Sequence, residues 1–293
     1  TEQAERVSRE LELMRLVSSK GHMPMLPAML CTFASPLALF SLFKTRIACE
    51  LSHLCEHTGY QLSPEAVRYI GACVVLALER LHGGLNVVAR NLSPDALGVD
   101  ENGCVCLMDF RQAKLLGTGD ESRTYTLCGM ADYLSPEQVT CMGHGLPVDF
   151  WGLGVLLWEI SAGEGPWGNT ANEVNIYRSI TDHTSGALEK RLKAQRERGF
   201  LPPDIFVPNL VNLIDKLLVP DPQGRLGAGA EEMGTPRGSR RGFSELKGHK
   251  WFASIRWEQL VEGVTPSPLL TTAATHMREL LEANAHRTND ALL

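Results

Sequence analysis

Patterns typical of membrane-bound and secreted proteins are missing from this sequence of 293 residues. The longest apolar run, residues 70–78, is well short of the ~18 residues that a membrane-spanning helix needs. The first residues contain no apolar block of the kind found in signal peptides. Acidic residues outnumber basic ones, which gives a net charge of -6. We therefore expect a cytoplasmic piece of a longer protein that binds neither nucleic acid nor membranes.

Disulfide and zinc patterns are also scarce. The eight cysteines include no Cys-x-x-Cys pair. The nearest two, Cys104 and Cys106, are separated by Val105, and neighbouring residues in such a run point to opposite faces of a strand. We find no pair of cysteines or histidines at zinc spacing, so we predict reduced, mostly buried thiols and no metal site among these residues.

The patterns that are present predict a mainly helical chain with a few short strands. The pair Asn102–Gly103, between two apolar runs, predicts a tight hairpin. Gly-rich residues 228–242 are expected to form an exposed loop. Apolar periodicity predicts strands at 27–34 and 37–43, and helices at 4–19, 62–83, 147–163, 185–198, 207–219 and 273–286.

Five sequence blocks occur in an order known from one family. The blocks are RNLSPDALGVDENGCVCLMDF, RTYTLCGMADYLSPE, PVDFWGLGVLLWEI, DPQGRLG and GHKWFASIRWEQL. Together they resemble the large, helical lobe of a protein kinase, most closely the AGC kinases that are regulated by cyclic nucleotides. Finer details, such as DFR and CGMAD, resemble the kinase-like region of plant and green-algal proteins that also carry a protein phosphatase 2C and cyclic-nucleotide-binding domains.

This resemblance implies an α+β protein-kinase-like fold, represented mainly by the helical large lobe, or C-lobe. Residues 1–50 would be a remnant of the small lobe, or N-lobe, with one helix and short strands. Residues 51–262 would form the C-lobe, and residues 263–293 a tail with a helix.

The catalytic loop lacks three side chains that kinases use. Asn91 stands where the family has the aspartate that accepts the proton of the substrate hydroxyl, and an amide cannot take that proton near neutral pH. Ser93 replaces the lysine that steadies the transferred phosphate, and Ala96 replaces the asparagine that binds the second magnesium ion. Asn91 and Ser93 are then interpreted as residues that only cap and turn a loop.

The nucleotide-binding features are incomplete in the same way. Asp109 matches the aspartate that holds magnesium, but Arg111 replaces the glycine that follows in the family motif. We hypothesise that Arg111 pairs with Asp109 and stands in for the metal; an ordinary exposed arginine is the alternative. If the glycine position needed a positive φ, a side chain there would cost ~1–2 kcal/mol.

The residues given contain no GxGxxG loop and no Val-Ala-x-Lys strand before the first helix. Glu10 matches the helix glutamate that would pair with that lysine, and without it we interpret Glu10 as a solvated residue. We expect no cofactor for this chain alone, whereas an active full-length kinase would require ATP and Mg²⁺.

The activation segment and its supports are better preserved. Thr126 occupies a position that related kinases phosphorylate, where a phosphate would pair with Arg90; a plain surface threonine is the alternative. The next family threonine is replaced by Met130. The resemblance assigns structural roles to three further residues, which are Glu137 and Arg225 as a buried ion pair and Asp149 as the anchor of the catalytic loop.

Substrate recognition is the last function that the resemblance suggests. Asp95 and Glu159 match acidic positions that read arginines in a substrate peptide, although both are also consistent with ordinary surface acids. The Arg-Ser-Arg-Arg string in residues 237–242 is a weaker candidate for a phosphorylation site or an internal ligand.

We therefore predict a pseudokinase that acts as a regulatory or binding module in signalling. Its partner would be a protein or peptide, such as a fused phosphatase or cyclic-nucleotide-binding domain. Two alternatives remain open: an active serine/threonine kinase for basic substrates, and a structural subunit of a larger assembly.

Overall fold

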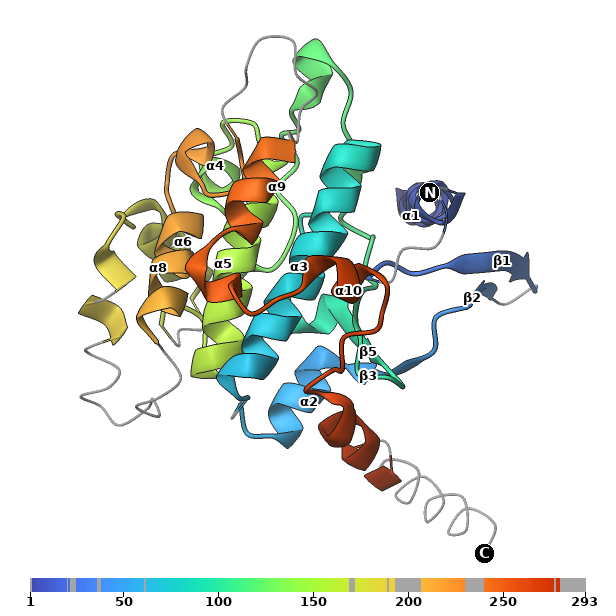
Figure 1. The fold of residues 1–293 in the computed structure, drawn as a ribbon. Coiled ribbons are helices and arrows are strands. Elements are labelled where there is room, and N and C mark those ends of the chain that lie inside the picture. The colour runs from blue at the N-terminus through green and yellow to red at the C-terminus, as the bar shows by residue number, and fades with distance from the viewer. Residues whose placement is uncertain are drawn as a thin grey trace, which may run out of the picture.

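The computed structural model describes most of the chain, as helices and short antiparallel strands around one main hydrophobic core (Figure 1). The described residues are 2–19, 21, 25–35, 38–60, 62–168, 172–188, 190–192, 207–229, 240–276, 278 and 279.

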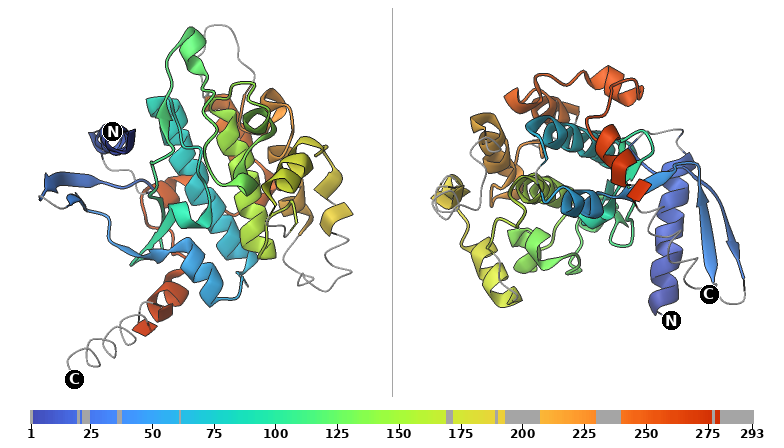
Figure 2. Two further views of the ribbon diagram at one scale, coloured as in Figure 1. Left: turned by 180° about the vertical axis from the view of Figure 1, so that it is seen from behind. Right: turned by 90° about the horizontal axis from the view of Figure 1, so that it is seen from below.

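The first part of the chain forms a helix and a hairpin at one side of the molecule (Figure 2). Helix α1 (Glu2–Ser19) confirms the first predicted helix, and it buries the apolar side chains of Leu13, Met14 and Val17. Strand β1 (Met29–Ala34) pairs antiparallel with β2 (Leu39–Phe43), as predicted. This hairpin exposes five large apolar side chains, namely Leu30, Phe33, Leu39, Phe40 and Leu42.

A three-stranded antiparallel sheet joins the first part of the chain to the helical body. Its order is β3 (Ile47–Glu50), β5 (Leu97–Asp100) and β6 (Val105–Leu107). The turn between β5 and β6 contains Asn102 and Gly103, which confirms the predicted hairpin. Gly103 has a φ of 75°, and Asp100 accepts hydrogen bonds from the backbone N–H groups of Asn102 and Cys104. Because β3 pairs with β5, residues on both sides of the predicted boundary at residue 50 share one sheet.

The helical body is centred on α3 (Pro64–Leu85) and α5 (Pro147–Ala162), which lie side by side (Figure 1). Helix α3 begins as predicted, because the Ser63 side chain accepts the Ala66 N–H at 3.2 Å and proline fills the first helical position. Helix α5 is buried nearly all round, which its largely apolar sequence favours. Helices α2 (Leu51–His57), α8 (Pro208–Leu217) and α9 (Arg240–Lys247) pack around this central pair.

Shorter elements complete the described structure. Strand β4 (Val87–Val88) pairs with β7 (Lys114–Leu115) and so brackets the catalytic-loop residues. Helices α4 (Pro136–Val139), α6 (Glu173–Thr181) and α10 (Trp257–Val261) follow. The 3-10 turns are η1 (Pro94–Ala96), η2 (Gly119–Ser122), η3 (Ala131–Tyr133), η4 (Pro222–Gly224) and η5 (Lys250–Phe252).

One predicted loop extends too far at its C-terminal end. Residues 240–242 belong to α9, although they were expected in the loop at 228–242. The helix forms here because Phe243 and Leu246, three residues apart, are both buried against the core. Residues 230–239 lie outside the described structure, and with them the first half, 237–239, of the arginine-rich string at 237–242.

Two predicted helices are described only in part. Within 185–198, residues 185 and 186 form a turn, residues 187, 188 and 190–192 are helical, and residues 189 and 193–198 lie outside the described structure. The tail helix begins at residue 270 rather than 273, and it is helical over 270–276, 278 and 279. In the described parts of the chain, none of the helices is both long enough and apolar enough to cross a bilayer.

Candidate active site

The base of the catalytic loop is anchored by a buried carboxylate. Asp149 in α5 accepts the backbone N–H groups of Ala89 and Arg90, each at 2.8 Å, and lies 2.7 Å from Nε2 of His82. Arg90 has a φ of 61°, an unfavourable value for a residue with a side chain. The two hydrogen bonds to Asp149 hold this conformation, so that the anchoring role predicted for Asp149 is consistent with the structure.

The tip of the loop carries the three replaced positions. Asn91 donates through Nδ2 to Asp109 Oδ2 at 2.9 Å, and its own carbonyl accepts the Ser93 hydroxyl at 3.3 Å. Ala96 is fully buried in η1, and its backbone oxygen accepts the N–H groups of Met108 and Asp109. The loop is therefore folded against the Asp109 turn, but none of its three replaced side chains carries a positive charge or accepts a proton near neutral pH.

Asp109 is engaged by Arg111 through both carboxylate oxygens. Arg111 Nε donates to Oδ1 at 3.0 Å and Nη2 to Oδ2 at 2.7 Å, while the backbone N–H of Arg111 donates to Oδ1 at 2.9 Å. Burial acts to raise the pKa of Asp109, but the hydrogen bonds and charge of Arg111, with the Asn91 amide, lower the pKa overall. The pairing hypothesised from the sequence is thus present, with a carboxylate that is held ionised.

The backbone strain expected at Arg111, from a positive φ, is absent. Arg111 is not among the residues with a positive φ. The prediction of ~1–2 kcal/mol of strain is therefore wrong, because this turn places the side chain in an ordinary backbone region.

Glu10 faces the same turn from α1. It is half-buried, and burial followed by the nearby Asp109 charge raises its pKa, whereas Arg111 and the Phe110 N–H act in the opposite direction. The interpretation of Glu10 as a solvated helix residue is therefore wrong. It belongs to a group of two acids around one arginine.

The ion pair expected from the sequence is present and buried. Arg225 donates to both carboxylate oxygens of Glu137, at 2.6 and 2.7 Å. The same guanidinium also donates to the backbone oxygens of Val219, Pro147 and Pro220. It therefore ties the end of the activation segment to α5 and to the turn after α8.

The activation segment exposes Thr126. Two residues earlier, the Thr124 hydroxyl accepts the Lys114 ammonium at 3.0 Å, and the Thr124 backbone pairs with His144. The Arg90 side chain donates to the Gln112 backbone oxygen at 2.7 Å, and its buried Nη1 has no hydrogen-bond partner in the structure. Phosphorylation of Thr126 stays a prediction, as does its pairing with Arg90.

Asp95 and Glu159, the two acids proposed to bind arginines of a substrate, are close enough for the charge of Asp95 to affect the pKa of Glu159. Glu159 accepts the Tyr133 hydroxyl at 2.6 Å. Burial raises the pKa of Glu159, and the charges of Asp132 and Asp95 raise it further, while the Tyr133 hydrogen bond lowers it. The sequence reasoning missed Asp132, because only the fold brings η3 next to α5. In the sequence, only the position of Asp132 in the activation-segment block, three residues before Ser135, could have marked it as a candidate.

Comparison with known proteins gives the family of this chain. The model of the protein kinase domain matches residues 1–252. This chain belongs to the protein kinase domain family. A cAMP-dependent protein kinase catalytic subunit of Dictyostelium discoideum is 31% identical over 255 residues, which are 87% of this chain and 34% of the relative.

Two further relatives point to the same group of kinases. A cGMP-dependent protein kinase of Plasmodium berghei is 28% identical over 92% of this kinase chain and 28% of the relative. A cAMP-dependent protein kinase, catalytic subunit-like, of Caenorhabditis elegans is 32% identical over 72% of the chain and 45% of the relative. The chain thus spans less than half the length of each of these relatives.

The family match confirms the coarser part of the fold prediction, which is a protein kinase domain with both helices and strands. The restriction to the C-lobe is not confirmed, because the match begins at residue 1 and includes the segment interpreted as an N-lobe remnant. The domain boundary at residue 50 stays a prediction.

Proposed function

We propose that this chain is a catalytically impaired protein kinase domain that works as a regulatory or binding module. The observation that carries the proposal is the engagement of Asp109. Both of its carboxylate oxygens accept N–H groups of Arg111, and Oδ2 also accepts the Asn91 amide. The oxygens that would hold a magnesium ion in the family are therefore occupied by donors from the chain itself.

The residues present do not fit the two magnesium ions of an active kinase. A guanidinium lies at Asp109, where a dication would have to bind, and the methyl group of Ala96 supplies no ligand. Asn91 also leaves the substrate hydroxyl without a general base, a contribution typically worth ~10²–10⁴ in rate. These losses act on different parts of phosphoryl transfer, so that repair of one would leave the others.

The binding partner that we propose is a basic peptide or protein segment. Asp95, Asp132 and Glu159 place negative charge near one another: burial is the main cause that raises the pKa of Glu159, and the charges of Asp132 and Asp95 raise it further. An arginine in this group would relieve the repulsion and gain charge-assisted hydrogen bonds. We propose that the whole protein is cytoplasmic and belongs to cyclic-nucleotide or phosphatase-linked signalling; the residues that flank this chain in its gene would test the fused domains.

The first experiment measures phosphate transfer by the full-length protein to a basic peptide, with radiolabelled ATP and Mg²⁺. We expect wild type to give background incorporation and the triple variant Asn91→Asp, Ser93→Lys, Ala96→Asn to give no less than wild type. Transfer by wild type at a rate of an ordinary kinase, ~1–100 per second, would contradict the proposal. A thermal melt of each variant controls for folding, because Ala96 is fully buried.

The second experiment isolates the Arg111 contact. Removing its side chain by Arg111→Gly should free Asp109 and raise the affinity of the full-length protein for Mg·ATP, measured by calorimetry. Arg123→Gly is the matched control, since Arg123 is an exposed arginine in the activation segment. Mg·ATP affinity that is already high in wild type and unchanged in Arg111→Gly would show that the contact does not replace the metal.

Binding of the proposed partner is measured separately, with a fluorescent arginine-rich peptide. Glu159→Gln and Asp95→Asn should each weaken binding several-fold, whereas Glu258→Gln, an exposed acid on α10, should leave it unchanged. Equal binding by all four proteins would remove the peptide-binding role without deciding the question of catalysis.

An active serine/threonine kinase is the second candidate function, and a specific observation favours it. Asp109 is retained, Glu10 lies close to it, and both anchors of the loop and activation segment are in place. This function would require ATP and Mg²⁺ and a displacement of Arg111 from Asp109. The radiolabel experiment distinguishes the two candidates.

A further inference from the structure

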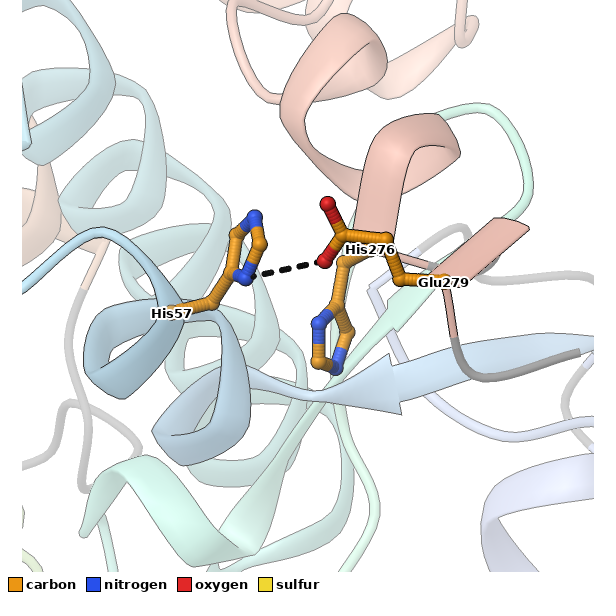
Figure 3. A group of neighbouring side chains, drawn as sticks. All are labelled: His57, His276 and Glu279. Carbon is orange, nitrogen blue, oxygen red and sulfur yellow. Dashed lines mark ion pairs between the residues drawn. The ribbon is translucent and has the colours of Figure 1, made fainter. Parts of the chain in front are cut away.

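Two histidines and a glutamate from distant parts of the chain meet at the foot of the molecule. His57 is at the end of α2, while His276 and Glu279 lie in the tail helix that begins at residue 270 (Figure 3). One potential ligand atom of each residue lies within 4.8 Å of those of the other two. The His57 and His276 rings are 5.0 Å apart between centroids. None of these residues takes part in the kinase site.

The spacing of these residues suits a site formed by two helices. His276 and Glu279 are three residues apart, so both project from one face of the tail helix. On α2, His53 precedes His57 by four residues and faces the same way, with its ring centroid 6.5 Å from that of His276. The sequence reasoning overlooked this i, i+4 pair, which is the spacing at which two histidines on a helix bind zinc.

The distances are close to those that a metal ion needs. Zinc binds histidine nitrogen at about 2.0–2.1 Å and carboxylate oxygen at about 2.0–2.2 Å in a tetrahedron, which puts its ligand atoms about 3.4 Å apart. His57 Nδ1 and Glu279 Oε2 are 3.4 Å apart. A side-chain rotation of His276 would close the remaining gap.

His276 supplies a second, independent observation. Its Nε2 atom is buried and has no hydrogen-bond partner in the structure, although a buried ring nitrogen normally has one. No donor or acceptor in the described part of the chain therefore uses the lone pair or N–H of this nitrogen.

We propose that His57, His276 and Glu279 bind a divalent transition-metal ion, with zinc as the ion that best suits two imidazoles and a carboxylate. His53 or a water molecule would supply the fourth ligand. The ion fastens the tail helix to α2, in addition to the burial of Leu269 and Ala273 in the main hydrophobic core. Residues about 220 positions apart in sequence would thus be joined by one ion.

The test is a zinc titration of the full chain, without a histidine tag, in competition with a chromogenic chelator and in the presence of a non-thiol reductant. We expect wild type to bind one zinc ion. His57→Ala, His276→Ala and Glu279→Gln should each lower the affinity at least about tenfold, because loss of a mere supporting partner already costs about 10–100-fold. His57 and Glu279 are exposed, so that their variants should remain folded.

Two controls separate this site from binding by the free cysteines. Cys31→Ser removes an exposed thiol, and Glu258→Gln removes an exposed carboxylate, and neither should change zinc affinity. Cobalt substituted for zinc should give the visible bands of a tetrahedral site without a thiolate charge-transfer band. A thiolate band, or unchanged affinity in the His57→Ala and His276→Ala proteins, would overturn the proposal.

Hydrogen exchange tests directly whether zinc holds the tail helix against α2. Zinc should slow amide exchange at residues 270–279 in wild type, and should have no effect there in His57→Ala. Slowing of exchange that persists in His57→Ala would also overturn the proposal.

Discussion

The base and the tip of the catalytic loop differ in what holds them. The base, Ala89 and Arg90, is fixed by two 2.8 Å hydrogen bonds to the buried Asp149. The tip is held by polar contacts to the Asp109 turn, such as the 2.9 Å hydrogen bond from Asn91 to Asp109, and by the 3.3 Å hydrogen bond from Ser93 to Asn91. The shape of the loop therefore depends on α5, behind it, while its chemistry depends on residues that contribute little to that shape.

The same division separates the scaffold from the metal site. The Glu137–Arg225 pair is buried and makes several additional hydrogen bonds, whereas Arg111 is largely exposed where it meets Asp109. A chain can thus lose the side chains for phosphoryl transfer and keep a kinase fold. Each of the four predictions that follow changes either a residue that supports the fold or a residue at the tip of the catalytic loop.

The largest effect is expected for Arg225→Met. This change leaves the Glu137 carboxylate buried without its partner, and it removes donors from three backbone oxygens. The free energy of unfolding should fall by about 3–5 kcal/mol, as measured by urea denaturation. The control is Arg46→Met, which breaks an exposed pair with Glu101 and should cost less than about 1 kcal/mol. Equal effects in both variants would contradict the structural role of Arg225.

A smaller loss of stability is expected for Asp149→Asn, a change that keeps the size of the side chain. The amide can accept only one of the two N–H groups that Asp149 accepts, and its NH₂ group faces the other. Unfolding free energy should decrease by about 2–3 kcal/mol in urea. Amide exchange at Ala89 and Arg90 should rise, since these are the N–H groups released. No change in their exchange would show that other contacts hold the loop base.

These anchors could be located from the sequence, because they belong to blocks of residues with fixed order and spacing. The hairpin at Gly103 and helices α3 and α5 also followed from local turn signals, caps and apolar periodicity. The remaining features depend on tertiary contacts that spacing does not report. Glu10 reaches Asp109 only after α1 has packed, and Asp132 reaches Glu159 only when η3 lies against α5. The φ angle of Arg111 likewise depends on the turn that forms. The glycine that the family has at this position therefore led to a wrong prediction of backbone strain.

A pH-dependent effect is expected at His144, next to the activation segment. Burial and the nearby Arg90 charge lower the pKa of His144 to about 4. The unfolded chain, with a histidine pKa of about 6.5, takes up the proton first, so stability is full above that value and is lost as the pH falls towards 4.

Between pH 7.5 and 5, this group should remove about 1–2 kcal/mol of unfolding free energy, since water near the segment screens part of the effect. His144→Gln should show a shallower loss over the same range in urea melts at each pH. Parallel curves for wild type and His144→Gln would show that His144 is protonated equally in both states.

The smallest effect is expected at the tip, for Ser93→Ala. Ser93 is buried, but its hydrogen bond to Asn91 is long and joins two side chains of the same loop. Removing the hydroxyl should cost less than about 1 kcal/mol of unfolding free energy, at the lower end for a single hydrogen bond. The double variant Asn91→Ala, Ser93→Ala should then lose little more than Asn91→Ala alone, because the two residues share that contact. A loss as large as that of Asp149→Asn would mean that the tip also holds the loop, and the division between shape and chemistry would fail.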